Sequence, residues 1–176
     1  NLGATTAMGQ LRSAIRATAP YVPDPATLLG RADVIAGQIS GAECATVACA
    51  LLDPATGELS YAGAGHPPFM VVQADGATSY LAGGRGLPLG VAPAPRASAG
   101  TRLAPGDRLI MYTDGLYERR AESPDVGLAR LARLAAEARA LPPTELSQAL
   151  ADGMLEGAEP GDDICVLVAA PAFSLA

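Results

Sequence analysis

The sequence predicts an α+β domain in which helices cover antiparallel β-sheet. Two helical segments come first, about six strand segments follow, and two further helices precede a last strand. Most neighbouring strands are joined by short hairpin turns, and this grouping favours an antiparallel sheet over an alternating parallel one. With 176 residues, 49% of them hydrophobic and 17% charged, the chain has the length of one domain and enough apolar residues for a core.

The N-terminal part is expected to form two helices. Residues 3–18 place their apolar side chains at helical spacing, and the prolines that follow end this helix. Asp24 then stands as an N-cap before Pro25, where proline is favoured at the first helical position. The second helix is predicted to run from there to about Ile39.

The middle of the chain reads as strands separated by turn residues. Pro54–Gly57 and Asp75–Gly76 have the composition of hairpin turns, and a glycine-rich loop spans residues 83–90. That loop lacks the Lys-Ser/Thr ending of a phosphate-binding loop. The strands are predicted at residues 45–53, 58–62, 69–73, 78–81, 96–103 and 107–113.

Two helices and a strand are expected in the C-terminal third. Residues 126–139 place leucines on one helical face, and Thr144 is predicted to cap a helix that reaches about Glu156. Pro142-Pro143 separates the two helices. Residues 164–169 (ICVLVA) are an apolar run typical of a buried strand.

Composition excludes several functional classes. All 12 basic residues are arginine, 18 residues are acidic, and the net charge is −6, so a nucleic-acid binder or an anionic-membrane binder is not expected. No apolar stretch approaches the ~20 residues of a membrane span. Cys44, Cys49 and Cys165 lie in apolar runs without zinc-ligand spacing, which predicts buried, reduced thiols in a cytoplasmic protein.

The candidate catalytic residues are carboxylates at strand ends. Asp114 follows the strand predicted at 107–113 and precedes Gly115, while Asp162 and Asp163 directly precede the last strand. Carboxylates gathered at such positions repel one another, and a hard divalent cation with oxygen ligands is the usual remedy. Asp-Gly is also an ordinary turn and Asp162 is compatible with a capping role, so the residues alone leave both interpretations open.

Two other polar features have a functional and a structural interpretation. The Arg119-Arg120 pair is placed to steer a phosphoprotein towards Asp114, or is a solvated charged face. His66, the only histidine, is of a residue type that can act as a general acid. Its place in Gly-His-Pro-Pro, however, favours a structural role in a turn between strands.

Six stretches together resemble a known family. Residues 112–118 (YTDGLYE) and 161–168 (GDDICVLV) are similar in order and separation to motifs of the metal-dependent protein phosphatase (PPM) family, in particular its bacterial SpoIIE/RsbU-type branch. Further stretches agree with that branch: 8–16 (MGQLRSAIR), 61–68 (YAGAGHPP), 86–91 (GLPLGV) and 105–107 (PGD).

The resemblance implies a fold, an activity and a cofactor. The fold is an αββα sandwich of two antiparallel sheets flanked by helices, with a two-metal site of Mn²⁺ or Mg²⁺. The activity is hydrolysis of phosphoserine or phosphothreonine on a protein by a metal-activated water. By match to the family's motifs, Asp114 and Asp162 are catalytic metal ligands, and Asp163 and Gly115 support the metal site.

One departure from the family bears on activity. A further metal-bridging Asp of the family stands shortly before the helix that begins here near Gly3, upstream of Asn1. Residues 1–176 are therefore expected to form a single SpoIIE/RsbU-type phosphatase domain that is N-terminally incomplete. The alternative is a catalytically inactive phosphatase-like module that binds a partner protein.

The resemblance also indicates partners. The usual substrate in this branch is a phosphorylated anti-sigma-factor antagonist, and sensor domains in the full-length protein and a second copy of the chain are further candidates. An apolar stripe on the first helix is compatible with either the core or an interface; it consists of Ala4, Ala7, Met8 and Leu11.

Overall fold

The computed structural model describes residues 2–92, 94–120, 122–157 and 162–172. Two compact units are distinguished. Unit 1 comprises Asn1–Leu52, Leu59–His66 and Gly83–Thr101, and unit 2 comprises Asp53–Glu58, Pro67–Ala82 and Arg102–Ala176.

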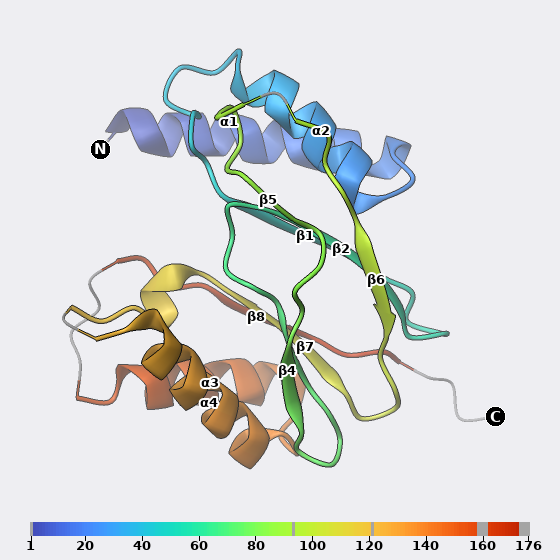
Figure 1. Cartoon of the computed structure of the whole chain (residues 1–176), viewed down its shortest axis with the longest axis vertical. Coiled ribbons are helices and arrows are strands. Elements are labelled where there is room, and N and C mark those ends of the chain that lie inside the picture. The colour runs from blue at the N-terminus through green and yellow to red at the C-terminus, as the bar shows by residue number, and fades with distance from the viewer. Residues whose placement is uncertain (1, 93, 121, 158–161, 173–176) are drawn as a thin grey trace. The chain divides into compact units, whose positions relative to one another are not determined.

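Unit 1 combines two helices with the first sheet (Figure 1). Its helices are α1 (Leu2–Thr18) and α2 (Pro25–Ala36), joined by a short 3-10 turn. The sheet has the order β1-β2-β5, with β6 also paired to β2. β1 and β2 are antiparallel, whereas β2 and β5 run parallel. The strands are β1 (Val47–Leu52), β2 (Glu58–Ala64), β5 (Arg85–Gly86) and β6 (Ala99–Arg102).

The helices of unit 1 begin and pack as their sequence dictates. Asp24 caps α2 by accepting the Thr27 N–H at 3.0 Å, with Pro25 in the first turn. Ala7 and Leu11 of α1 are both buried in the core with Leu29, whereas Met8 is 58% exposed. The apolar stripe of α1 is therefore divided between core and surface.

Unit 2 is an antiparallel sheet with two helices on one face (Figure 1). The strand order is β4-β3-β7-β8, and α3 and α4 pack against each other and against this sheet. Its elements are β3 (Met70–Val72), β4 (Thr78–Tyr80), β7 (Arg108–Tyr112), the 3-10 turn η2 (Asp114–Leu116), α3 (Pro124–Ala138), α4 (Pro143–Leu155) and β8 (Val166–Ala169).

Every second side chain of β3 and β7 contributes to the core of unit 2. Met70 pairs with Ile110 across β3 and β7, and both are fully buried with Leu131 of α3 and Leu150 of α4. Asp107, 8% exposed, accepts the N–H groups of Ala74 (3.1 Å) and Ala104 (2.9 Å), and so fixes the turn before β7. A buried carboxylate is tolerated there because both of its oxygens are hydrogen-bonded.

The predicted fold class is confirmed: two antiparallel sheets with flanking helices are present, with β2–β5 as one parallel exception. Three local predictions were wrong. α2 ends at Ala36, because Gly37 closes the helix and Gln38 bonds back to Ile35 in a turn. The short strand β5 lies inside the glycine-rich segment. α4 begins at Pro143, so that Thr144 lies within it and does not cap it.

The cysteine prediction was also wrong in part. Cys44 and Cys165 are exposed and Cys49 is half-buried. Cys44 lies in a loop with a φ of 65°, and Cys165 precedes β8, so neither is part of a strand. Burial raises the pKa of the Cys49 thiol, and the charge of Asp24 adds to this.

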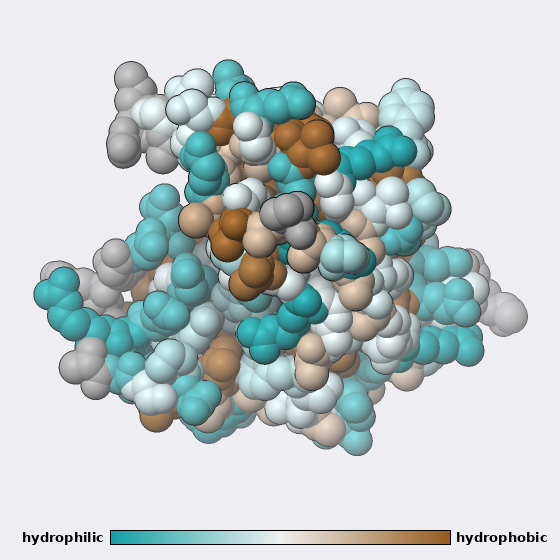
Figure 2. Space-filling model, turned by 45° about the horizontal axis from the view of Figure 1, so that its top comes forward, coloured by the Kyte–Doolittle hydropathy of each residue, from teal (hydrophilic) through white to brown (hydrophobic). Residues whose placement is uncertain are grey.

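The surface carries only small apolar areas on the face viewed in Figure 2. Exposed apolar side chains include Val34 of α2 and, in the loop after β5, Leu87 and Val91. None of the described helices combines the length and the apolar character needed to cross a membrane.

Candidate functional site

The pairing of β7 with β8 brings the candidate carboxylates to one end of the unit 2 sheet. The last pair in the register is Tyr112 with Val166. Because the two strands are antiparallel, the residues after Tyr112 and the residues before Val166 leave the sheet at the same end. Asp114 and Asp162, 48 positions apart in sequence, are thereby brought to the same place.

Thr113 holds the two segments together. Its N–H donates to the Cys165 carbonyl at 3.1 Å, and its Oγ1 accepts the Cys165 N–H at 2.9 Å. The same hydroxyl donates to the Asp163 carbonyl at 3.1 Å. Three hydrogen bonds from one residue thus extend the β7–β8 pairing beyond the last ladder pair.

Gly115 allows a close backbone contact at the same point. A Cβ at this position would lie 2.7 Å from the Asp163 carbonyl oxygen and 3.2 Å from the carbonyl carbon and oxygen of Asp162. All three are backbone atoms that cannot rotate away. A glycine is therefore required by space, not by a left-handed backbone, since its φ lies outside that region.

A hollow of about 360 Å³ opens beside these residues. Asp114 and Asp162 are both exposed, and each uses its Oδ1 to accept the N–H of the next residue, at 2.9 and 2.8 Å. Within the described part of the chain, the Oδ2 atoms have no hydrogen-bond partner and neither carboxylate is ion-paired. The residues lining the hollow are Asp114, Gly115, Glu118, Arg119, Arg120 and Asp162.

Comparison with protein families gives a match over almost the entire chain. The model of the Stage II sporulation protein E (SpoIIE) family matches residues 1–171. The chain belongs to the SpoIIE family. The expected resemblance is thus confirmed.

Solved structures agree with this family. The RsbU and RsbW domains of a Mycobacterium tuberculosis protein match at 30% identity and a TM-score of 0.89, over 97% of this chain and 50% of that one. The SiaA-PP2C domain of Pseudomonas aeruginosa matches at 24% identity and a TM-score of 0.74, over 93% and 68% of the two chains. The phosphatase domain of Bacillus subtilis SpoIIE matches at 16% and 0.63, over 92% and 71%.

These matches establish a phosphatase domain of the SpoIIE/RsbU type with a PPM fold. The SpoIIE-family chain spans about half the length of the M. tuberculosis protein it matches. The similar structures include a PP2C domain and a PPM Ser-Thr phosphatase.

The SpoIIE-family chain brings three of the four predicted site residues to the hollow: Asp114, Gly115 and Asp162. Asp163 does not line it, and instead contributes its backbone carbonyl to the contacts with Thr113 and Gly115. Their roles as metal ligands stay predictions.

Sequence reasoning overlooked Glu118 as a member of the site. Its N–H donates to the Asp114 carbonyl at 2.9 Å, so the turn after β7 continues for one helical step and places both carboxylates on the hollow. The i, i+4 spacing of two acidic residues after an apolar strand was the available signal.

The donor chemistry of the hollow suits a hard divalent cation, since carboxylate oxygens are the preferred ligands of Mg²⁺ and Mn²⁺. The ligand number is incomplete: no three His, Cys, Asp or Glu residues of the described chain are grouped closely enough to hold a metal ion. A metal site at this hollow therefore stays a prediction, and among the described residues the carboxylates of Asp114, Glu118 and Asp162 are its available oxygen donors.

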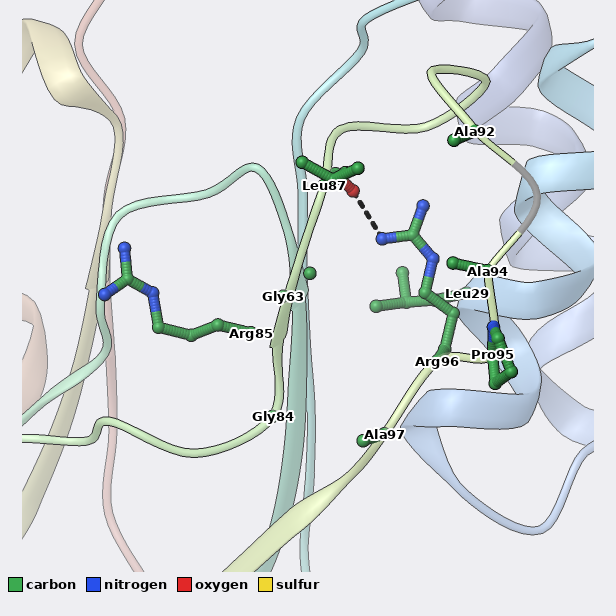
Figure 3. A pocket seen from close by; sticks show the side chains of 11 residues that line it. Leu29, Gly63, Gly84, Arg85, Leu87, Ala92, Ala94, Pro95, Arg96 and Ala97 are labelled. Carbon is green, nitrogen blue, oxygen red and sulfur yellow. Dashed lines mark hydrogen bonds between the residues drawn. The ribbon is translucent and has the colours of Figure 1, made fainter.

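A second, smaller cavity of about 70 Å³ lies within unit 1 (Figure 3). Arg96, only 6% exposed, binds Asp33 through Nε at 2.7 Å and Nη2 at 2.6 Å, and also donates to the Leu87 carbonyl. Arg85, the other basic residue of the lining, points away from it (Figure 3). Arg96, the buried cation of the cavity lining, is already paired with Asp33, which gives this cavity a structural role.

Proposed function

We propose that this chain is the catalytic part of a metal-dependent protein phosphatase that hydrolyses phosphoserine or phosphothreonine. The observation that supports this most is the pair of exposed carboxylates, Asp114 and Asp162, which the Thr113 bonds and the Gly115 contact hold at one sheet end. Both residues line the hollow, and their Oδ2 atoms have no hydrogen-bond partner among the described residues. Family membership supplies the reaction class.

Asp114 and Asp162 would hold Mn²⁺ or Mg²⁺, with Gly115 and Asp163 supporting the site. The bound ion would supply an activated water and neutralise charge on the phosphoryl group. The chain's own residues orient the two carboxylates, because their Oδ1 atoms are fixed by backbone N–H groups and their Oδ2 atoms are left for a ligand. We further propose that residues 1–176 belong to one phosphatase domain and that an upstream Asp completes the ligand set.

The proposed substrate is a phosphorylated regulatory protein in the cytoplasm, such as an anti-sigma-factor antagonist. The similar M. tuberculosis protein, which has RsbU and RsbW domains, supports a regulatory pathway of this kind. Sensor domains in the full-length protein and a second copy of the chain are proposed as further partners.

The test is Mn²⁺-dependent phosphate release from a phosphoserine protein by the full-length protein. Asp114→Asn and Asp162→Asn should each lower activity at least about 100-fold and weaken Mn²⁺ binding in calorimetry. Asp152→Asn removes the same charge from an exposed position on α4 outside the hollow and should keep full activity.

A second function is favoured by one observation, the incomplete ligand set of the described residues. The chain would then be a catalytically inactive module that binds a partner protein. A folded wild-type protein, checked by circular dichroism, with neither phosphate release nor Mn²⁺ binding would support this alternative and would refute the proposed phosphatase.

A further inference from the structure

Arg119 and Arg120 are adjacent in sequence but differ in what they contact. The Nη2 of Arg119 donates to the Met154 carbonyl at 2.6 Å, in the last turn of α4. The carbonyls of a last helical turn lack partners within the helix, and a guanidinium there satisfies one of them and complements the helix dipole. Arg119 therefore has a structural role, because it links the segment that follows η2 to the end of α4.

Arg120 is exposed, and within the described residues its guanidinium makes no hydrogen bond and no ion pair. It nevertheless lines the same hollow as Asp114, Glu118 and Asp162. The hollow therefore contains one guanidinium group, that of Arg120, with no hydrogen-bond or ion-pair partner among the described residues.

Arg119 and Glu122, close to Arg120 in sequence, are each bonded to a helix. Arg119 binds α4, and Glu122 binds the Nη2 of Arg130 on α3 at 2.5 Å. The Glu122 N–H also donates to the Arg119 carbonyl at 3.1 Å. The bond from Arg130 lowers the pKa of Glu122, so this anchor is ionised at neutral pH. Arg120 thus follows directly on a residue that is bonded to α4, and its own side chain has no partner among the described residues.

We propose that Arg120 binds a non-bridging phosphoryl oxygen of the phosphoserine or phosphothreonine substrate, an inference that rests on the proposed function. A phosphate monoester is repelled by the three carboxylates of the hollow, so its binding needs positive charge at the same place. A guanidinium presents several N–H donors in a planar fork that matches phosphate geometry. Arg120 is the group of the lining that meets both requirements, since Arg119 is already bound to α4.

The test compares Arg120→Gln, Arg120→Lys and wild type in the full-length protein with Mn²⁺. With p-nitrophenyl phosphate, which has no peptide flank, Arg120→Gln should lower kcat/KM by about 10- to 100-fold, and the fall should be smaller at high salt. The kcat/KM of Arg120→Lys should lie between those of wild type and Arg120→Gln, because lysine keeps the positive charge but lacks the planar, forked donors of the guanidinium.

A matched control removes an arginine charge elsewhere in unit 2. Arg133 lies on α3, is 60% exposed and, among the described residues, pairs only with Glu137. Arg133→Gln should leave kcat/KM within about twofold of wild type, because an exposed i, i+4 pair contributes little. Unchanged melting temperatures would show that all variants are folded.

Two outcomes would overturn the inference. One is a kcat/KM of Arg120→Gln within twofold of wild type on p-nitrophenyl phosphate. The other is a loss seen with a phosphoprotein alone, which would assign Arg120 to acidic side chains flanking the phosphoserine.

A direct binding measurement separates this inference from the proposed function. Inorganic phosphate is titrated in the presence of Mg²⁺ and followed by ³¹P NMR. Phosphate binding that is weakened about 10-fold by Arg120→Gln supports Arg120 even if wild type proves inactive. Equal binding by both proteins, or none by wild type, refutes the assignment.

Discussion

Replacing Gly115 by alanine would test whether the contact between η2 and the Asp162-Asp163 segment builds the site. The added Cβ would lie 2.7 Å from the Asp163 carbonyl oxygen, so the two segments have to separate by roughly 0.7 Å or more to reach ordinary contact. Strain of this kind in a tightly packed contact costs about 1–3 kcal/mol. The melting temperature should fall by about 2–4 °C for each kcal/mol.

The same displacement should impair the site more than the fold. The three Thr113 bonds measure 2.9–3.1 Å and would lengthen as the segments part, so Asp162 would lose its fixed place relative to Asp114. Small misplacements of reacting groups reduce rates by up to about 100-fold. Mn²⁺-dependent phosphate release from a phosphoserine protein and Mn²⁺ calorimetry would measure the effect.

Gly30→Ala is the matched control, because a Cβ at Gly30 meets no atom within 4 Å and the residue lies inside α2. It should raise the free energy of unfolding by about 0.5–1 kcal/mol and leave activity unchanged. If Gly115→Ala matched wild type in melting temperature and in Mn²⁺ affinity, the close contact would not be what positions Asp162.

Three further substitutions test the surrounding scaffold. Arg119→Gln should lower the free energy of unfolding by about 1–2 kcal/mol in urea denaturation, because the Met154 carbonyl at the end of α4 loses its donor; no change would contradict the anchoring role. Tyr112→Phe should cost less than about 1 kcal/mol in the same assay, since the buried Tyr112 hydroxyl interacts with Tyr80 but meets no well-formed hydrogen bond among the described residues; a larger loss would show that the contact with Tyr80 is a full hydrogen bond. Burial raises the pKa of Asp33, but the hydrogen bond from Arg96, a backbone N–H and the Arg96 charge outweigh it, so the net pKa is lowered. This stabilisation is present above the ordinary pKa of about 3.9 and is lost as pH falls through the lowered value, so Asp33→Asn should cost about 2–4 kcal/mol at pH 7 and progressively less below pH 4 in thermal melts; a loss that does not change with pH would refute the linkage.

Local sequence signals predicted the elements that depend on local chemistry. Asp24 before Pro25 located the start of α2, and the run at 107–113 located β7 to within one residue at each end. The end of α2 and the strand β5 depend on turns and on a partner strand, which no local pattern contains.

Most of the residues of the site were predictable from the sequence, but their geometry was not. Asp114 and Asp162 each stand at a strand end in the sequence, yet their meeting depends on β7 pairing with β8 across 50 or more residues. The hydroxyl of Thr113 and the missing Cβ of Gly115 fix that meeting. A threonine or a glycine in the sequence does not predict such a role, because the role depends on the position of the partner segment.

The two arginines show the same limit for charge. Arg119 and Arg120 are identical in type and adjacent, so no sequence pattern separates them. Their difference comes from the Met154 carbonyl, which lies 35 positions away and engages only the first. A long-range contact thus decides which guanidinium remains available.

The charges of the hollow explain why a free arginine belongs beside the proposed metal ligands. Three carboxylates and two guanidinium groups line it, so its formal charge is negative and a phosphate monoester would be repelled. A divalent cation bound by Asp114 and Asp162, as proposed above, would reverse the sign of the local charge. Arg120 then adds directed donors where the ion supplies charge alone, so phosphate recognition at this hollow requires both.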